Sequence, residues 1–219
     1  MPGPFDTPFE SLPESLPVFP LSGALLLPRC RLPLNIFEPR YLRMTEDALA
    51  GDRLVGIVQP LDINSDDSAP VLFEIGCAGR ITSFSETDDG RMLIILTGVS
   101  RFHVADEIDV DTPYRRVMPS WEFFRRDLFE EPDGTIDRDR LYASLRAYFE
   151  VRDLDTDWNM LDDATDESLI NSLSMSCPFG PAEKQALLEA PDLTERGRLM
   201  LSLLDMATLD HVNGELPLH

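Results

Sequence analysis

Proline interrupts almost every apolar stretch near the start of this chain, and this pattern constrains the fold more than any other feature. The breaks lie at Pro13, Pro17, Pro20, Pro28 and Pro33. Each proline lacks the main-chain N–H that a central strand donates to its neighbour. The segment therefore predicts short edge strands and turns.

A helix is expected directly after this segment. The fixed φ of Pro39 suits the first position of a helix, and Glu38 places negative charge at the positive end of the helix dipole. Residues that follow at helical spacing are Tyr41, Leu42, Thr45, Ala48 and Leu49. The pattern predicts a helix from Pro39 to about Ala50.

Residues 16–122 otherwise show the period-two alternation of β-strands. Expected strands are Leu54–Val58, Val71–Ile75, Ala78–Ser85, Arg91–Thr97, Arg101–Val104, Ile108–Val110 and Tyr114–Met118. Asp88-Asp89-Gly90 indicates a tight hairpin, because glycine takes the positive φ that such turns need. Many short strands at close spacing predict a small closed or nearly closed barrel.

Helical spacing replaces this alternation later in the chain. Residues 123–136 mix charges with turn residues and form the expected junction, so strands should give way to helices between residues 120 and 138. Residues 137–210 are expected to form a helical bundle and residues 1–15 an irregular leader. Within the bundle, Asp166 and Thr194 are expected helix caps and Pro181 an expected helix start.

The charge of the chain is strongly negative. It carries 40 acidic and 19 basic residues, for a net charge of −21. Such a surface repels a phosphate backbone, so nucleic-acid binding would need a local basic patch. The best candidates are the pairs Arg115-Arg116 and Arg125-Arg126, and we expect these arginines to pair with nearby acids. The sequence therefore predicts no nucleic-acid partner.

The cysteines indicate neither a disulfide framework nor a metal site. Cys30, Cys77 and Cys177 are odd in number, far apart and without CxxC spacing. We expect free thiols and no cofactor. The start of the chain lacks the features of a signal peptide, and no apolar run is long enough to span a bilayer. These features predict a cytoplasmic protein without a membrane partner.

Several blocks of the sequence carry a resemblance to a known family. They are Leu16–Leu21, Leu34–Leu42, Asp52–Pro60, Phe73–Ile81, Leu96–Phe102, Leu169–Phe179 and Pro181–Leu188. Together they resemble the Lon N-terminal substrate-binding domain family, above all its free-standing bacterial members. The resemblance implies an α+β fold, with an N-terminal PUA-like twisted β pseudo-barrel that has one early helix, followed by a C-terminal helical bundle. It also implies a domain that delivers proteins to a protease without being the protease.

The enzymatic parts of Lon find no match in the sequence. There is no Gly-x-x-x-x-Gly-Lys-Ser/Thr phosphate loop. The Lon peptidase uses a serine activated by a lysine, whereas the sole lysine here, Lys184, is expected on the solvated side of an amphipathic helix. No spacing brings a cysteine together with His103 or His211, and the pairs Asp88-Asp89 and Asp162-Asp163 fit turns. We therefore expect a protein that is not an enzyme.

Two clusters beside prolines are candidate binding residues. They are Phe37, Glu38, Arg40 and Tyr41, with Arg80 as a further partner for the charges, and Pro178 with Phe179. In a binding role they would line a groove between the two lobes, where an extended peptide or a ligand could sit. In a packing role the first is a strand-to-helix junction and the second a loop against the barrel.

The preferred hypothesis for function is a recognition module. It would bind unfolded or degron-bearing polypeptide, or a partner protein, through exposed apolar surface. The alternatives are a small-molecule-binding module and an RNA-binding PUA-like module, the latter opposed by the charge of −21. An orphan hydrolase is disfavoured because no nucleophile–base pattern is present.

Overall fold

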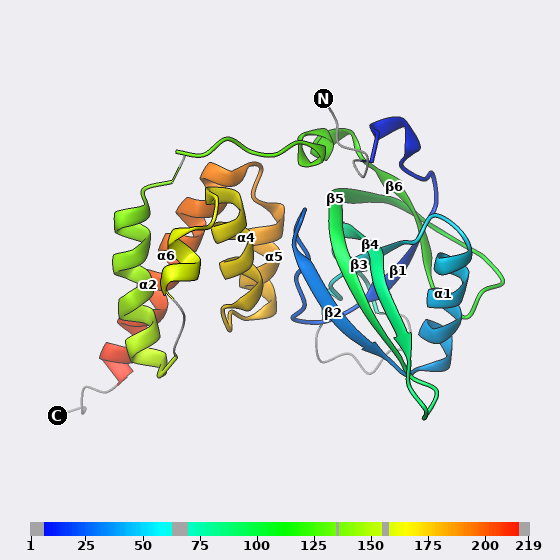
Figure 1. The fold of residues 1–219 in the computed structure, drawn as a ribbon, viewed down its shortest axis with the longest axis horizontal. Helices are drawn as coiled ribbons and strands as arrows, with labels where there is room; N and C mark the ends of the chain where they lie inside the picture. Colours follow the sequence, from blue (N-terminus) through cyan, green and yellow to red (C-terminus); the bar gives the residue numbers. More distant parts are fainter. Residues whose placement is uncertain (1–6, 63–69, 135, 155–157, 215–219) are drawn as a thin grey trace. The chain divides into compact units, whose positions relative to one another are not determined.

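The protein folds into two compact units, seen here in a computed structural model (Figure 1). The described residues are 7–62, 70–134, 136–154 and 158–214. The first unit contains Met1–Glu130 and Phe179–Leu188, and the second contains Glu131–Pro178 and Glu189–His219. The described strands lie in the first unit, and the second is helical.

A six-stranded sheet builds the first unit. Its strands are β1 (Leu16–Pro20), β2 (Arg31–Ile36), β3 (Leu54–Val58), β4 (Ile75–Glu86), β5 (Met92–Ile108) and β6 (Arg116–Ser120). Their order is β2-β5-β4-β3-β1-β6, and β5 also pairs with β6, which closes all strands except β2 into a barrel. β1 and β3 run parallel, and the other pairs are antiparallel. The expected pseudo-barrel is confirmed.

The barrel interior is organised around Phe102. This side chain is fully buried and meets the ring of Trp121 edge to face, with ring centroids 5.5 Å apart. Gly56 and Gly76 lie against the same ring, since a Cβ at either position would come within 2.9 Å of Phe102 Cζ. Glycine in β3 and in β4 thus leaves the space that the Phe102 ring fills at the centre of the barrel.

Proline protects the outer edge of β2, which pairs on one side only, with β5. Gly98 N donates to Cys30 O at 2.8 Å, so the alternation of an antiparallel ladder directs the main-chain groups of Leu32 and Leu34 toward β5. The main chain of Pro33 then faces outward, where it offers no donor to another strand. This is the edge role that the prolines of the sequence predict.

Several local predictions are confirmed. Helix α1 spans Pro39–Ala50 and begins at the predicted proline. Gly90, with φ of 80°, turns the hairpin between β4 and β5. The strands end with β6 at Ser120, and α2 (Arg138–Arg152) follows after a 3-10 helix, η2 (Glu122–Leu128). A short 3-10 turn, η1 (Phe9–Ser11), lies in the expected leader.

The helices of the second unit are α2, α3 (Trp158–Asp162), α4 (Asp166–Ser176) and α6 (Leu193–Gly214). Leu141, Leu145 and Tyr148 form the buried face of α2. None of the helices in the described part of the chain is long and apolar enough to cross a membrane.

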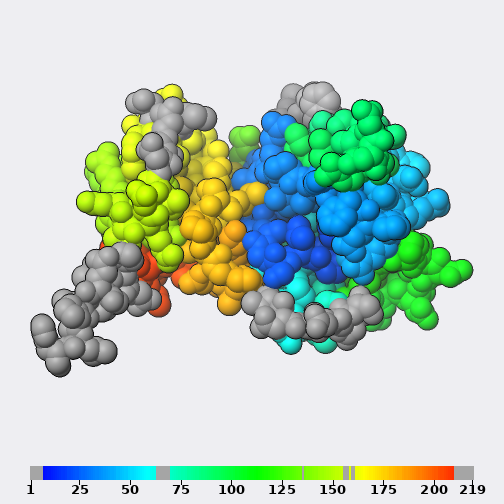
Figure 2. All heavy atoms as spheres, turned by 90° about the horizontal axis from the view of Figure 1, so that it is seen from below, coloured from blue at the N-terminus to red at the C-terminus, as the bar shows by residue number. Residues whose placement is uncertain are grey.

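Helix α5 (Pro181–Glu189) groups with the first unit, although we expected residues 137–210 to form one bundle. Gln59 Nε2 donates to Pro181 O at 3.1 Å and to Gln185 Oε1 at 3.0 Å, and Gln185 Nε2 donates to Ile75 O at 3.1 Å. Lys184 Nζ donates to Gly23 O at 3.1 Å. In the space-filling view the orange atoms of α5 adjoin the blue atoms of the N-terminal strands (Figure 2).

Both expected helix caps of the bundle are corrected by the structure. Thr165, not Asp166, caps α4, because its side chain accepts from Ser168 N. Asp166 is buried and accepts from Arg138 Nε at 2.7 Å and Gly134 N at 2.7 Å. Asp192, rather than Thr194, accepts from Glu195 N at the start of α6. In each case a neighbouring side chain satisfies the free N–H groups first.

Several strand predictions are corrected by the structure. The predicted strands Arg91–Thr97 and Arg101–Val104 belong to one continuous strand, β5, which ends at Ile108, so Ile108–Val110 is not a strand of its own. The predicted strand after Pro70 is also absent. Val71–Ile75 does not form a ladder, and only Leu72 makes an isolated bridge, to Pro60, before β4 begins at Ile75. Pro70 precedes the segment and removes a donor, so the apolar run becomes a connecting segment rather than a strand.

Candidate functional site

The connecting segment Pro70–Glu74 forms one wall of a pocket in the first unit. Main-chain hydrogen bonds fix it on both sides. Leu61 N donates to Val71 O at 2.8 Å, and Phe73 N donates to Gln59 O at 2.9 Å. Val104 N on β5 donates to Glu74 O at 2.7 Å. These hydrogen bonds fix the position of the segment, although it is not a strand of the sheet.

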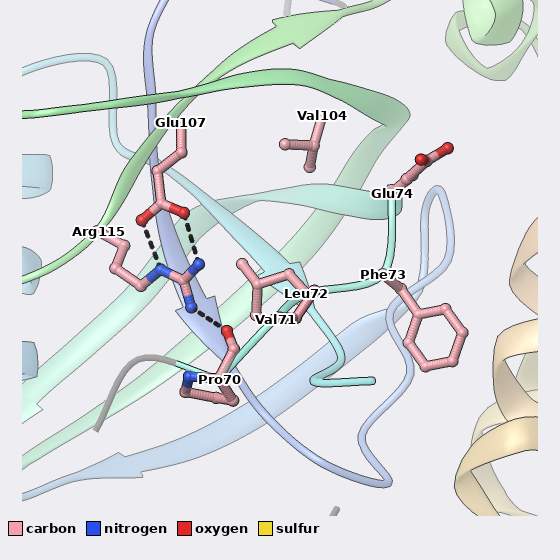
Figure 3. A pocket seen from close by; sticks show the side chains of 8 residues that line it. All are labelled: Pro70, Val71, Leu72, Phe73, Glu74, Val104, Glu107 and Arg115. Carbon is pink, nitrogen blue, oxygen red and sulfur yellow. Dashed lines mark hydrogen bonds and ion pairs between the residues drawn. The ribbon is translucent and has the colours of Figure 1, made fainter. Parts of the chain in front are cut away.

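The pocket has a volume of about 390 Å³ (Figure 3). Its lining residues are Pro70, Val71, Leu72, Phe73, Glu74, Val104, Glu107 and Arg115. Most of these are apolar, and Val71 is 71% exposed. A concave apolar surface with a few polar groups is the usual form of a binding site.

The guanidinium of Arg115 is fully engaged within the pocket wall. Its Nε and Nη2 donate to the two carboxylate oxygens of Glu107 at 2.6 and 2.5 Å, and its Nη1 donates to Pro70 O at 2.6 Å (Figure 3). The hydrogen bond from Arg115 lowers the pKa of the Glu107 carboxyl below its ordinary value, against a smaller opposing effect of burial. A carboxylate held ionised in this way is a poor proton acceptor.

The surroundings of the pocket are acidic. Glu74 lies 3.1 Å from His103 Nε2, and its side chain is largely exposed. The stretch that carries Glu107 also carries exposed carboxylates at Asp106 and Asp109. Arg115 is the only basic lining residue, and it is already paired. An incoming segment would therefore meet an apolar surface beside negative charge.

The lining set contains no serine, threonine, cysteine, lysine or histidine, so it offers no ordinary nucleophile–base pair. Among the residues that the structure describes, no three His, Cys, Asp or Glu side chains are grouped so that they could hold a metal ion.

The predicted residues of the β2–α1 junction lie close together. Arg40 Nη2 lies 3.0 Å from Glu38 Oε2, and the Arg40 guanidinium lies 4.6 Å from the centre of the Tyr41 ring. Tyr41 is only 6% exposed and packs on Phe19, with ring centroids 4.1 Å apart. Phe37 is 63% exposed. Of the two aromatics here, only Phe37 presents its ring to solvent.

The other predicted residues do not join this cluster. Arg80 donates to Asp52 O and to Thr7 Oγ1, each at 3.0 Å, while Glu38 pairs with Arg40. Phe179 belongs to the first unit and is 8% exposed, whereas Pro178 is exposed and belongs to the second. Their assignment to a groove stays a prediction.

Sequence reasoning missed the pocket for an identifiable reason. It predicts a strand at residues 71–75. It also expects Arg115 to pair with a nearby acid, which the ion pair with Glu107 confirms, but it does not place that pair beside this segment. The pairing of Arg115 with Glu107 follows from the β5–β6 ladder, in which Glu107 stands opposite Val117. The available clue was Pro70, which directly precedes the apolar run and removes a main-chain donor that a strand would need.

Comparisons with known proteins agree on one family. A family model described as the ATP-dependent protease La (LON) substrate-binding domain matches residues 15–206. Among curated proteins, a Lon protease of Flavobacterium johnsoniae is 27% identical over 218 residues, which is 94% of this chain and 25% of that protein. Lon protease 2 of Bdellovibrio bacteriovorus is 26% identical over 91% of this chain and 25% of that protein. The chain thus spans about a quarter of the length of these relatives.

Solved structures support the same fold. A Lon N-terminal domain protein from Xanthomonas campestris aligns with a TM-score of 0.58 at 23% identity, over 93% of this chain and 99% of that chain. The N-terminal domain of a Mycobacterium avium complex Lon protease aligns with a TM-score of 0.58 at 19% identity, over 90% and 99%.

Proposed function

Because the chain belongs to the LON substrate-binding domain family, we propose that it recognises polypeptide without catalysing a reaction. The pocket lined by Pro70–Glu74, Val104, Glu107 and Arg115 would take one apolar side chain of the bound segment. The bound polypeptide would be unfolded or degron-bearing, or an exposed segment of a partner protein.

The pocket carries this proposal. Arg115, Glu107 and Pro70 O already bond to one another, so the apolar surface supplies the affinity. The largely exposed carboxylate of Glu74 favours a segment whose apolar residue has lysine or arginine beside it. The net charge of −21 acts in the same direction and favours fast encounter with basic segments.

The alternatives fit the same surface less well. A volume of about 390 Å³ would also admit a small molecule, and a soaked fragment library would detect one. A nucleic acid would bring phosphates to a site bordered by Glu74 and Glu107. No phosphate loop is present in the sequence to support nucleotide hydrolysis.

The test uses synthetic 15-residue Gly/Ser peptides with a central Lys-Leu-Lys, measured by fluorescence anisotropy. Replacing the peptide's leucine by alanine should weaken binding about tenfold, because the apolar side chain supplies the anchor. Val71→Ser should weaken binding by a similar factor. Leu93→Ser is the matched control, because Leu93 is another exposed aliphatic residue, on β5.

A second arm tests the charge. Glu74→Gln should weaken the Lys-Leu-Lys peptide and leave a Ser-Leu-Ser peptide unaffected, while Glu46→Gln on α1 should change neither. The pocket assignment fails if Leu93→Ser weakens binding as much as Val71→Ser. It also fails if the leucine-to-alanine peptide binds as well as its parent.

A further inference from the structure

The segment around η2 buries one set of side chains and exposes another. Phe124 has non-helical φ and ψ, so η2 consists of two short 3-10 turns joined at a kink, and Phe129 follows it in extended conformation. Trp121, Phe124 and Asp127 are buried, and we name them the buried row. Phe123, Arg126 and Phe129 are exposed, and we name them the η2 stripe; Phe123 is 87% exposed and Phe129 67% exposed.

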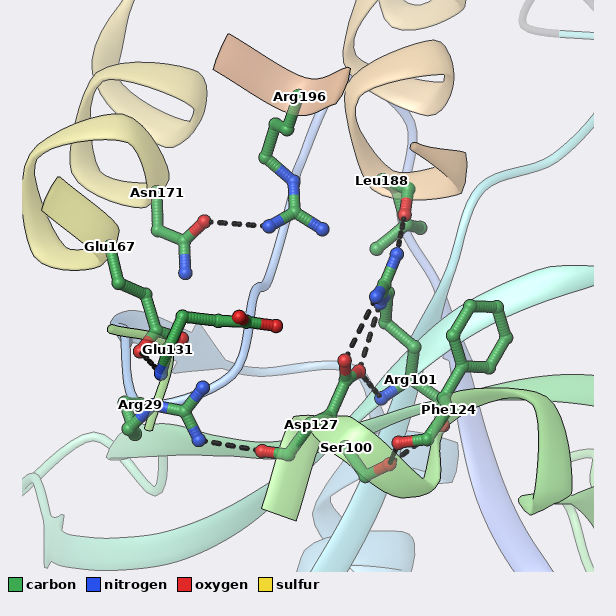
Figure 4. Close-up of polar contacts among 10 residues, drawn as sticks. All are labelled: Arg29, Ser100, Arg101, Phe124, Asp127, Glu131, Glu167, Asn171, Leu188 and Arg196. Carbon is green, nitrogen blue, oxygen red and sulfur yellow. Dashed lines mark hydrogen bonds and ion pairs between the residues drawn. The ribbon is translucent and has the colours of Figure 1, made fainter. Parts of the chain in front are cut away.

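The buried row is anchored by one ion pair. The Asp127 carboxylate accepts from Arg101 Nε at 2.9 Å, from Arg101 Nη2 at 2.8 Å and from Arg101 N at 2.9 Å (Figure 4). Arg101 Nη1 donates to Leu188 O at 2.9 Å, and its guanidinium lies 4.4 Å from the centre of the Phe124 ring. Both charged side chains are buried, and each is hydrogen-bonded to the other.

Main-chain contacts add to this anchor. Arg29 Nη1 donates to Asp127 O at 2.6 Å, and Trp121 Nε1 donates to Pro13 O at 3.0 Å. Because the backbone of η2 is fixed from beneath, the η2 stripe is held in place before any partner arrives. A preorganised surface loses little conformational entropy on binding.

The two arginines of η2 differ in their surroundings. Arg125 stacks on the Phe9 ring at 4.1 Å and lies 3.8 Å from carboxylate oxygens of Glu10 and Glu122. Arg126 has no side-chain hydrogen bond or ion pair with any residue that the structure describes. Both arginines were predicted to pair with nearby acids. The prediction holds for Arg125 but not for Arg126 among the described residues.

We propose that the η2 stripe is a second docking site, which binds an acidic–apolar peptide segment. Arg126 would hold a carboxylate, and Phe123 and Phe129 would each contact an apolar side chain. Alternate side chains of an extended peptide lie on one face, so a segment of the pattern apolar-x-Glu-x-apolar presents one carboxylate between two apolar groups. The stripe offers the complementary order, with Arg126 between Phe123 and Phe129 in the sequence.

Other occupants fit less well. A second copy docked about a twofold axis would place Arg126 against Arg126 of the partner copy, which is repulsive. A single-stranded RNA could stack bases on the two rings, but its repeated phosphates would meet Glu122 and Glu130 beside the stripe and a chain of net charge −21. A peptide needs only one carboxylate.

This site is independent of the pocket, and its test uses a different probe. The probe is a labelled 12-residue peptide with a central Leu-Ser-Glu-Ser-Leu, titrated with the full chain. Replacing its glutamate by glutamine should weaken binding about tenfold. Arg126→Gln should have the same effect, and Phe123→Ser or Phe129→Ser should weaken binding several-fold, with melting temperatures unchanged because all three side chains are exposed.

Matched controls are available on the same unit. Arg125→Gln and Phe37→Ser change an arginine and an exposed phenylalanine outside the stripe, and both should bind as the unaltered protein does. The proposal is overturned if the glutamine peptide binds equally well, if Arg125→Gln matches Arg126→Gln, or if the probe does not bind at millimolar concentration. Tighter, Arg126-dependent binding of oligouridine would assign the stripe to RNA instead. A dimer that Phe123→Ser dissociates would assign it to self-association.

Discussion

The pocket and the η2 stripe share one unit but offer opposite chemistry. In the pocket the apolar residues are accompanied by Glu74 and Glu107, and the nearby arginine is already paired. In the stripe the apolar rings flank Arg126, which has no ion-pair partner among the described residues. Whether an arginine is paired thus decides which charge each surface presents.

The difference also lies in how each surface is held. The pocket wall is fixed by main-chain hydrogen bonds and by a partly exposed ion pair between Arg115 and Glu107. The stripe is fixed from beneath by a buried ion pair, between Arg101 and Asp127. Loss of a partner is far more costly for a buried charge than for a half-exposed one. The two surfaces should therefore respond differently to removal of their anchors.

The largest expected effect is on the stripe's anchor. Asp127→Ala leaves the Arg101 guanidinium buried without its carboxylate, so the free energy of unfolding should fall by about 3–5 kcal/mol. Urea unfolding followed by tryptophan fluorescence measures this. Asp52→Ala, at an exposed position, should cost less than about 0.5 kcal/mol. A loss for Asp127→Ala no larger than that of the control would show that the ion pair does not anchor η2.

An intermediate effect is expected at the pocket. Arg115→Gln removes both bonds to Glu107 and the bond to Pro70 O, and should lower the free energy of unfolding by about 1–2 kcal/mol. The Lys-Leu-Lys peptide should bind more weakly to this variant, because Pro70 belongs to the wall that it would contact.

Arg91→Gln provides the comparison for Arg115→Gln. Arg91 pairs with Asp89 at 2.8 Å in an exposed hairpin, where solvent screens the ion pair, so Arg91→Gln should lower the free energy of unfolding much less than Arg115→Gln. Equal losses in the two variants would contradict a structural role for Arg115. Weaker binding of the Leu-Ser-Glu-Ser-Leu peptide to Arg115→Gln would show that the two surfaces are coupled.

The features that the sequence predicted depend on neighbouring residues. Pro39 starts α1 and Gly90 turns a hairpin because the required φ is a property of the residue itself. Pro33 protects the sheet edge for the same reason. Signals of this kind are complete within a few residues, and no tertiary contact is needed to interpret them.

The features that the sequence did not predict depend on distant residues. Helix α5 joins the first unit through Gln59 and Gln185, which are far apart in the chain. The exposure of the η2 stripe depends on which side chains of this segment pack against Arg101. The amphipathic pattern of these segments shows that one face is buried, but not against which partner.

A smaller effect is expected from acid at the pocket. The Arg115 hydrogen bond lowers the pKa of Glu107, so the ionised form stabilises the fold above the unfolded-state pKa of about 4.3, and this contribution is lost as the pH falls through the folded-state value. The difference in unfolding free energy between the protein and Glu107→Gln should be constant from about pH 7 to pH 5 and shrink below that.

The double variant Glu107→Gln with Arg115→Gln isolates this effect. In the Arg115→Gln background, Glu107→Gln should remove little pH-dependent stability, because the group that lowers the pKa is already gone. A difference that grows toward low pH in the single variant would contradict the assigned direction of the pKa shift.

The smallest effect is expected at Phe37, the exposed aromatic of the junction that the sequence singled out. Phe37→Ser should change the free energy of unfolding by less than about 0.5 kcal/mol, because the ring is 63% exposed. Tyr41→Ala, four residues later, should cost about 3–5 kcal/mol, because that ring is buried against Phe19. Neither probe peptide should bind Phe37→Ser more weakly than the unaltered protein. If either peptide loses more affinity with Phe37→Ser than with Val71→Ser or Phe123→Ser, the β2–α1 junction is part of the binding surface and the division into pocket and stripe is incomplete.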